Sequence, residues 1–336
     1  MTITAVPARN RQWVLASRPA GRADESNFRM IDAAVPPVQD GQALIKVHYL
    51  SLDPYMRGRM DDVKSYAAPQ KLDEVMVGGT VGEVVESKTD KLQPGDMVAG
   101  MGGWQQYYQT AAGGVRVIDT RGVPASAYLG VLGMPGVTAW YGLLRIGRPN
   151  VGETVVVSAA SGAVGSVVGQ LARIHGCRAV GFAGGPAKCA YVVDELGFDA
   201  CVDYKSDDAR AAFAAATPEG VDVVFENVGG KVFDMTLARM NVSGRVALCG
   251  LIAGYNGQDI APRNVRSILV NRLTVTGFIV SDHMDVWPQA LHELGQHVAS
   301  GALKYRESIA TGIESAPAAF IGLLNGENFG KQLVKL

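Results

Sequence analysis

Short runs of β-branched and apolar residues alternate with stretches of helical periodicity through the middle of the chain. The first run, 154–157, enters a turn of small residues, and an apolar helical pattern follows it through Ala172. Similar runs, each expected to form a strand, lie at 178–183, 200–204, 221–226, 244–249 and 272–278. Helices are expected at 188–196, closed by a left-handed Gly197, and in the alanine-rich stretch 209–216. This alternation predicts a doubly wound parallel sheet over residues 131–302.

Residues 1–130 have a different character, with short β patterns separated by glycine and proline. Strands are expected at 43–50, 76–85 and 97–100, with a turn at 94–96 before the last of them. This spacing is typical of a compact, β-rich, barrel-like domain. Residues 303–336 return to a helix and a terminal strand, which we expect to complete this first domain. Two domains also suit the length, because 336 residues are too many for one core.

The turn after the 154–157 run is the strongest functional signal. It contains Ala160-x-Gly162-x-x-Gly165, with alanine where the dinucleotide fingerprint usually has its first glycine. Gly162 would let the backbone approach a pyrophosphate, and Gly165 would let the helix pack closely on the strand. The pyrophosphate would then lie against backbone N–H groups at the helix N-terminus. Ser161, Ala163 and Val164 complete this predicted binding turn. The alternative is a small-residue turn that serves tight packing alone.

The choice of cofactor depends on the end of the second strand. A domain that binds NAD(H) usually places Asp or Glu about twenty residues after the glycine turn, to hold the ribose 2′-hydroxyl. Here that position is Ala183-Gly184-Gly185, and Lys188 follows within one helical turn. The missing carboxylate and the nearby cation favour NADP(H). The alternative for Lys188 is a solvated lysine in the first turn of a helix.

Charge and composition exclude several classes of protein. The 31 basic and 32 acidic residues nearly cancel, so the basic excess of a nucleic-acid-binding protein is missing. No apolar run is long enough to span a bilayer, and no apolar region follows Arg9 and Arg11 as in a secretory signal. The four cysteines, at 177, 189, 201 and 249, are expected to be buried free thiols. Together these features predict a cytoplasmic protein without membrane or nucleic-acid partners.

A zinc site is not expected in the first domain. A structural site needs four thiolate or imidazole ligands, and a catalytic site needs three protein ligands. The first 170 residues contain no cysteine and one histidine, His48, which is expected to be packed or half-exposed in its strand. The remaining histidines do not cluster with cysteine. Without a Lewis acid, simple alcohol oxidation is the less favoured chemistry.

Four blocks of sequence resemble one family. They are Leu52-Asp53-Pro54-Tyr55-Met56-Arg57, Gly133-Met134-Pro135-Gly136-Val137-Thr138-Ala139, Glu226-Asn227-Val228-Gly229-Gly230 and Asn328-Phe329-Gly330-Lys331. Together they resemble the zinc-independent medium-chain reductases, in particular the prostaglandin and leukotriene B4 reductase group and its bacterial NADPH-dependent curcumin reductase branch. The resemblance implies a GroES-like catalytic domain, an inserted Rossmann cofactor domain, and reduction of the carbon–carbon double bond of α,β-unsaturated ketones or aldehydes.

The resemblance also implies roles for individual residues. Tyr255 would hydrogen-bond the substrate oxygen and act as general acid, while Tyr55 would line the substrate site. Tyr66 lies in a polar loop, 64–69, of the kind that can fold over a ligand. The alternative for Tyr55 and Tyr66 is a packing role with the hydroxyl at the surface. Lys188 and Tyr204 would bind the 2′-phosphate, with Ser161 near them. Further cofactor contacts are expected at Met134, Thr138, Gly184, Asn328 and Gly330.

Position in the predicted sheet adds further candidates, because ligands of parallel sheets bind at the carboxyl ends of the strands. The loops expected there carry Asn227, Cys249, Gly250, Phe278, Ile279 and Val280. A phenol with a pKa near 10 can donate a proton while uncharged, which suits Tyr255 to a developing enolate. The alternative is that Tyr255 covers the nicotinamide, and that solvent or a ribose hydroxyl donates the proton.

Three functions therefore remain open. The first is an NADPH-dependent reductase of small conjugated carbonyl compounds, either curcumin-like enones or smaller enals. The second is a zinc-free quinone reductase, and the third is a sensor that binds NADPH without turnover. The strand within 272–278 would end the sheet, and pairing with its twin across a two-fold axis predicts a homodimer.

Overall fold

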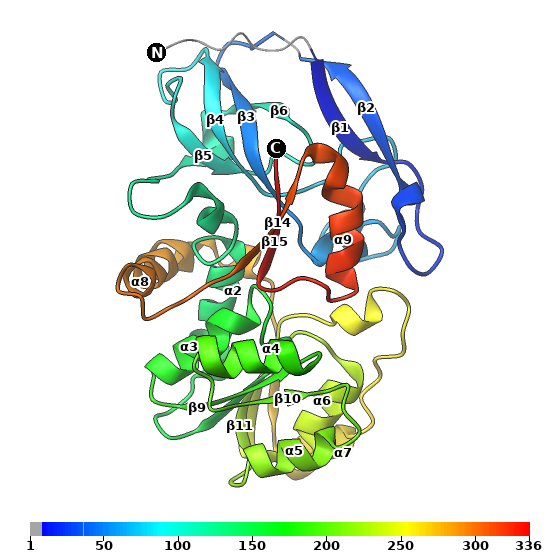
Figure 1. The fold of residues 1–336 in the computed structure, drawn as a ribbon, viewed down its shortest axis with the longest axis vertical. Helices are drawn as coiled ribbons and strands as arrows, with labels where there is room; N and C mark the ends of the chain where they lie inside the picture. The colour runs from blue at the N-terminus through cyan, green and yellow to red at the C-terminus, as the bar shows by residue number, and fades with distance from the viewer. Residues whose placement is uncertain (1–8, 36) are drawn as a thin grey trace. The chain divides into compact units, whose positions relative to one another are not determined.

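Six parallel strands form the sheet of the cofactor-type domain, in the order β10-β9-β8-β11-β12-β13 (Figure 1). The computed structural model describes residues 9–35 and 37–336. The strands are β8 (Thr154–Val157), β9 (Arg178–Ala183), β10 (Ala200–Asp203), β11 (Val221–Glu226), β12 (Met240–Leu248) and β13 (Thr274–Gly277). The order reverses beside β8, the central strand that enters the glycine turn. This is the doubly wound arrangement expected from the sequence.

Helices connect the strands of this sheet, and further helices precede its first strand in the chain and follow its last. They are α2 (Met134–Tyr141), α3 (Gly165–Ile174), α4 (Pro186–Ala190), α5 (Ala209–Ala216), α6 (Gly230–Leu237), α7 (Val265–Val270) and α8 (Trp287–Ala299). The chain continues from α2 and from α4 as π-helical turns at Gly142–Gly147 and Tyr191–Glu195. All four residues of β8 are buried, and Phe182 packs against Phe213 of α5 with ring centroids 4.7 Å apart.

The other domain is built on a seven-stranded sheet in the order β14-β15-β3-β4-β5-β7, with β6 paired to β3. Its strands are β3 (Gln42–Ser51), β4 (Thr80–Ser87), β5 (Met97–Gly100), β6 (Tyr107–Ala111), β7 (Val115–Val117), β14 (Glu307–Thr311) and β15 (Lys331–Lys335). A separate antiparallel pair joins β1 (Arg9–Leu15) to β2 (Phe28–Ala34). Helices α1 (Tyr55–Arg59) and α9 (Ala316–Leu324) complete it. In its core Phe28 stacks on Trp104, and Phe320 meets both rings edge-on.

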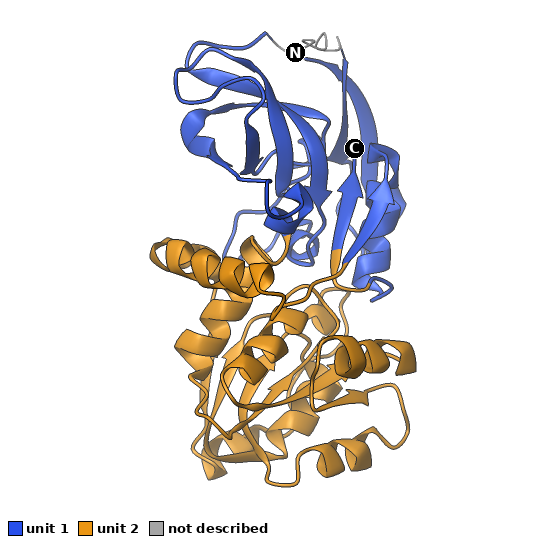
Figure 2. Cartoon of the chain, turned by 60° about the vertical axis from the view of Figure 1, so that its left-hand side comes forward, with its two compact units in different colours: residues 1–129, 307–328, 332–336 blue, residues 130–306, 329–331 orange. Residues whose placement is uncertain are grey.

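The chain divides into two units (Figure 2). Unit 1 contains residues 1–129, 307–328 and 332–336, and unit 2 contains 130–306 and 329–331. The division differs from the expected one at residue 130 and at two short segments, 303–306 and 329–331, all of which lie in unit 2. The segment 329–331 matters below, because its Gly330 lies against the glycine turn.

Several local predictions need correction. Strand β12 begins at Met240, earlier than expected, and continues past Ser243, which has φ +63°. Residues 76–79 precede β4, and Gly78 lies so close to Leu50 that a Cβ would be 2.9 Å from its side chain. Strand β1 was not predicted, because its polar residues hide the alternation. One of them, Asn10, is buried and donates to the carbonyl oxygen of Tyr107 at 2.7 Å.

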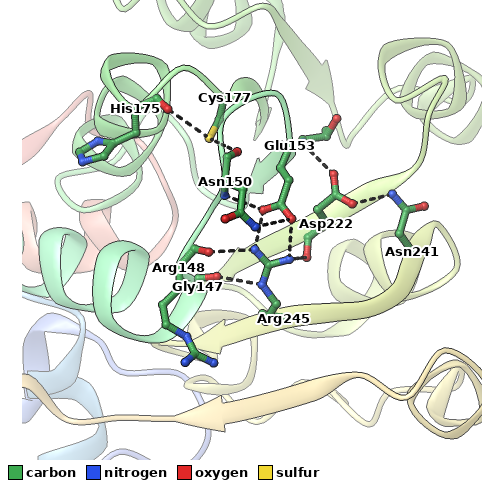
Figure 3. A network of polar contacts seen from close by, with 10 residues as sticks. Gly147, Arg148, Asn150, Glu153, His175, Cys177, Asp222, Asn241 and Arg245 are labelled. Atoms are coloured by element: carbon green, nitrogen blue, oxygen red, sulfur yellow. Dashed lines mark hydrogen bonds and ion pairs between the residues drawn. The ribbon is translucent and has the colours of Figure 1, made fainter.

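The cysteines are free thiols, as expected; Cys177 is buried, and the other three residues are half-buried. It lies in a polar network at the amino ends of β8 and β11, opposite the glycine turn (Figure 3). Arg245 organises the network by donating to Glu153 and to the carbonyl oxygens of Gly147 and Arg148, the latter two at 3.0 Å. Burial raises the pKa of the Cys177 thiol to about 11, so it is unreactive at neutral pH. We assign this network to stability.

No helix in the described ranges combines the length and the apolar character that a membrane crossing requires.

Two glycines in helices allow a matched stability test. In α3, a Cβ on Gly169 would lie 1.8 Å from the ring of Phe198, whereas in α8 a Cβ on Gly295 would meet nothing within 4 Å. Gly169→Ala should therefore lower the free energy of unfolding by about 1–3 kcal/mol through overpacking. Gly295→Ala should raise it by roughly 0.5–1 kcal/mol through helix propensity. Urea denaturation of both variants checks this. Equal effects would show that the close approach of α3 to Phe198 is not tightly packed.

Candidate functional site

The glycine turn between β8 and α3 has the geometry of a phosphate cradle. A Cβ on Gly165 would lie 2.3 Å from the carbonyl oxygen of Ala159, so only glycine fits there. Ala159 itself has a left-handed backbone with φ +51°. Helix α3 starts at Gly165 without a side-chain cap, but its N–H groups at 166–168 donate to the carbonyl oxygens of Gly162 and Val164, contrary to the expectation that they bind a phosphate. The space beside the turn is open, because a Cβ on Gly162 would meet only the Ala159 carbonyl oxygen within 4 Å. The turn therefore fits the pyrophosphate of a dinucleotide, on the geometry of its own backbone.

The structure also explains why alanine can replace the first glycine of the fingerprint. Ala160 is buried, and a Cβ added to Gly181 of β9 would lie 2.6 Å from the Ala160 methyl group. The methyl group thus occupies the space that Gly181 leaves open. The backbone N–H of Ala160 donates to the carbonyl oxygen of Phe182 at 2.9 Å. A first alanine is accommodated because the neighbouring strand carries the glycine.

The cationic end of the site lies where β9 and β10 finish. A Cβ on Gly184 would lie 3.0 Å from the Tyr204 hydroxyl and 3.1 Å from Cε of Lys205. Asp203 joins the two loops, because its carboxylate accepts from the backbone N–H groups of Gly185 at 2.9 Å and Lys205 at 3.0 Å. The structure thus brings the predicted Gly184 and Tyr204 together. Lys205 was missed by the sequence reasoning, and its place directly after Tyr204 was the available signal.

Lys188 belongs to the same cluster of positive charge. It is half-buried on α4, and both burial and the charge of Lys205 lower the pKa of its ammonium group. Repulsion between two cations that share a pocket is relieved when an anion binds between them. A ribose 2′-phosphate, with its charge close to −2, has the chemistry that this cluster fits.

The other end of the site is organised by a buried carboxyl group that was not predicted. Glu226, at the end of β11, is fully buried, and its Oε1 accepts from the Ser158 hydroxyl and from the N–H groups of Val228 and Gly229. These three distances are 3.0, 2.6 and 2.7 Å. Burial raises the pKa of Glu226. Ser158 directly follows β8 and precedes the glycine turn, so the Glu226 carboxyl group connects the carboxyl ends of β8 and β11.

Asn227 continues this connection. Its backbone N–H donates to the Ser158 hydroxyl at 2.7 Å, and its side-chain amide donates to the Ser158 carbonyl oxygen at 2.8 Å. The N–H groups of Cys249 and Gly250 donate to the carbonyl oxygen of Glu226 at 2.9 and 3.1 Å. Burial raises the pKa of the Cys249 thiol to about 12, which leaves it protonated. The predicted candidates Asn227, Cys249 and Gly250 are thus neighbours.

Tyr255 joins this group. It follows the short 3-10 turn Ile252–Gly254, whose Ile252 N–H donates to the carbonyl oxygen of Asn227 at 3.1 Å. The Tyr255 hydroxyl lies 3.8 Å from the position of a Cβ on Gly250. The ring is half-buried. The phenol therefore stands beside Asn227 and Gly250 at the carboxyl end of the sheet, where ligands of such sheets bind.

The remaining candidates of unit 2 have mainly packed environments. Phe278 contacts the rings of Phe225 and Tyr141, with centroids 6.1 and 5.6 Å apart, and Val280 is buried. Thr138 of α2 is nearly buried and donates to the carbonyl oxygen of Met134 at 2.7 Å, a bond within its own helix. Ile279 is half-exposed. Cofactor contact by these residues stays a prediction.

Gly330 lies against the glycine turn. Its N–H donates to the carbonyl oxygen of Ser161 at 2.8 Å, and Gly162 and Gly330 form a parallel bridge. Gly330 has φ +63°, and a Cβ there would lie 1.9 Å from the carbonyl oxygen of Arg306, so glycine is required. Three residues near the end of the chain are therefore part of the nucleotide unit.

The other predicted tyrosines lie in unit 1. Tyr55 begins α1, and burial and the charge of Asp53 raise the pKa of its phenol. Tyr66 lies in the loop after α1 and is 59% exposed. Asn328, also in unit 1, is half-buried. Tyr55 and Tyr66 as substrate contacts, and Asn328 as a cofactor contact, stay predictions.

The part of the chain that the structure describes shows no grouping of zinc ligands. Among the described residues, no three or more His, Cys, Asp or Glu side chains are grouped so as to hold a metal ion. His48 is half-exposed in β3 and lies 3.6 Å from the Glu83 carboxylate, in the setting that was expected.

Comparisons with known proteins identify the family. Residues 11–118 match the N-terminal domain of oxidoreductases, and 163–296 match the zinc-binding dehydrogenase domain. NADPH-dependent curcumin reductase of Escherichia coli (strain K12) is 47% identical over 98% of this chain and 97% of its own length. The 2-alkenal reductase (NADP(+)-dependent) of Nicotiana tabacum is 40% identical over 97% of both chains.

The fold comparison agrees. The crystal structure of CurA in complex with NADPH from Vibrio vulnificus has a TM-score of 0.93 and 45% sequence identity, and the match covers 97% of this chain and 98% of CurA. The fold and the site define a medium-chain dehydrogenase/reductase with a β-rich domain and a Rossmann domain. Within that class, the chain belongs to the family of NADPH-dependent reductases that contains the curcumin, 2-alkenal and prostaglandin reductases.

Proposed function

We propose that this chain uses NADPH to reduce the carbon–carbon double bond of α,β-unsaturated ketones and aldehydes, without zinc. It is an NADP(H)-dependent oxidoreductase acting on conjugated double bonds, like its relatives. The proposal rests on the groups gathered at one edge of the parallel sheet, where the carboxyl ends of its strands lie. That edge holds the glycine turn, the Lys188–Lys205 cations and the Asn227–Gly250–Tyr255 group within a single unit.

Each part of that edge has a distinct task. Bound NADPH supplies the hydride. The glycine turn ahead of α3 binds the pyrophosphate, while Lys188 and Tyr204 bind the 2′-phosphate. Tyr255 donates a hydrogen bond to the carbonyl oxygen of the substrate, and this bond strengthens as negative charge develops on that oxygen. Hydride addition to the β carbon leaves an enolate, and the phenol supplies the proton that completes the saturated carbonyl product, because an ordinary phenol is uncharged at neutral pH.

Acceptor specificity tests the proposed activity. The purified chain should oxidise NADPH rapidly with an enone or enal, but slowly with a simple quinone and not with a saturated ketone. The rates should survive a strong zinc chelator, since the described residues contain no cluster of metal-ligating side chains. The measurement is absorbance at the NADPH band. A preference for quinones would favour the quinone reductase, and tight NADPH binding with no turnover would favour a sensor.

Removal of the Tyr255 hydroxyl tests its role. Tyr255→Phe keeps the ring but loses one donor to the developing charge, so kcat with an enone should fall roughly ten- to a thousand-fold. The NADPH dissociation constant should hardly change. Tyr128→Phe serves as the control, because the Tyr128 hydroxyl donates to the Asp119 carbonyl oxygen within unit 1. A fully active Tyr255→Phe variant would assign protonation to solvent or to a ribose hydroxyl.

The charge of Lys188 tests cofactor choice. Lys188→Ala should weaken NADPH binding by about 1.5–3 kcal/mol and leave NADH nearly unchanged, while Lys88→Ala should change neither. The lowered pKa of Lys188 sets the direction of a pH effect. As the pH rises, Lys188 loses its proton earlier than an ordinary lysine, so NADPH affinity should fall and NADH affinity should not. Equal losses for both cofactors would assign Lys188 to the fold.

The proposal includes a homodimer and a cytoplasmic setting. The edge strand β13 exposes Val275, and the neighbouring α7 exposes Val265, Leu269 and Val270. An edge strand beside exposed apolar side chains is suited to pairing with a second copy. Sedimentation velocity should give a dimer, and Val275→Lys should shift it towards monomer; a wild-type monomer would contradict the proposal. The cytoplasmic setting is supported by the four free thiols.

A further inference from the structure

Two cations share one aromatic ring at the 2′-phosphate end of the site. The ring belongs to Phe329, in the segment that brings the end of the chain into unit 2. The Lys188 ammonium lies 5.2 Å from its centroid, and the Arg306 guanidinium lies 4.7 Å from it. Both distances are within the range of a cation–π contact. The function proposed above uses Lys188 and leaves Phe329 without a role.

The Phe329 ring is held from two sides. Tyr191, which is 5% exposed, meets it edge-on, with centroids 5.8 Å apart and planes at 74°. Arg306 also lies 5.4 Å from the centroid of the Tyr191 ring. Tyr191 begins the π-helical turn that continues directly from α4, the helix that carries Lys188. The same stretch of helix therefore carries Lys188 and the Tyr191 ring that contacts Phe329.

The backbone next to Phe329 is fixed as well. The Gly330 N–H donates to the Ser161 carbonyl oxygen at 2.8 Å, and the Lys331 N–H donates to the Arg306 carbonyl oxygen at 2.9 Å. Gly330 is thus held against the glycine turn, and the adjacent Phe329 presents an aromatic face to Lys188. A ring on such a support can orient a flexible lysine.

Lys188 needs such support because of its electrostatic setting. Burial and the nearby Lys205 both disfavour its charged form. Without a fixed contact, a long side chain would turn away from a second cation into water. The face of an aromatic ring attracts an ammonium group and carries no negative charge to compete with a phosphate. A carboxylate in the same place would hold the lysine but repel the ligand.

We infer that Phe329 is a positioning residue for recognition of the cofactor 2′-phosphate, and that it acts by holding the Lys188 ammonium towards that phosphate. The inference rests on the proposed role of Lys188. It predicts that the preference for NADPH over NADH depends on an aromatic side chain at position 329, although this residue lies 141 positions after Lys188.

The test is the binding of adenine nucleotides to the full chain by isothermal titration calorimetry. Phe329→Met keeps most of the volume but removes the π face. It should weaken 2′,5′-ADP and NADPH by about 3- to 30-fold, the range that a cation–π contact corresponds to, and leave NADH within two-fold. Phe329→Tyr keeps an aromatic face and should bind 2′,5′-ADP and NADPH with wild-type affinity. Phe329→Leu is the second variant, in case the first is unstable.

Double variants separate this inference from the proposed function. If Lys188→Ala weakens 2′,5′-ADP, adding Phe329→Met should cause little further loss, because the ring acts through the lysine. If Lys188→Ala has no effect on 2′,5′-ADP, the proposed role of Lys188 fails. If it has its effect and Phe329→Met has none, only the role of Phe329 fails. Equal weakening of NADH and NADPH by Phe329→Met, or failure of both variants to fold, would assign the ring to the fold and overturn the inference.

Discussion

The close approach of α3 to the end of β8 is the constraint on which this site depends. A side chain at Gly165 would collide with the Ala159 carbonyl oxygen, so the helix reaches the strand only because that side chain is absent. The approach lets the Ser166 N–H of α3 donate to the Gly162 carbonyl oxygen, and the Ser161 carbonyl oxygen accepts the N–H of Gly330. One steric condition therefore creates the phosphate cradle and the docking place for the end of the chain.

The two ends of the site use charge in opposite ways. At the proposed 2′-phosphate end, burial and the charge of the nearby Lys205 both lower the pKa of the Lys188 ammonium group. At the other end, Glu226 is buried and has its pKa raised, and it serves as a hydrogen-bond acceptor for the turn that follows β11. The first end gathers positive charge, whereas the second positions Asn227 and the turn that carries Tyr255 by hydrogen bonds within the chain. Such a division suits a cofactor with one highly charged end and one reactive end.

The sequence was informative wherever the pattern is local. Strand β11 and helix α5 have the predicted bounds, and the left-handed Gly197 lies where the helix ends. Sequence reasoning failed where a side chain is defined by a distant partner. A glutamate at a strand end is normally exposed, and the burial of Glu226 depends on Ser158, which lies 68 positions earlier. The role of Phe329 likewise depends on a return of the chain that no local pattern encodes.

The destination of the hydride tests the central claim most directly. An enone should be reduced with NADPH that carries deuterium on the transferable position of its nicotinamide C4, and the product analysed by NMR and mass spectrometry. The account predicts a saturated ketone with its carbonyl group intact and one deuterium on the carbon β to that carbonyl. An allylic alcohol with deuterium on the former carbonyl carbon would contradict it.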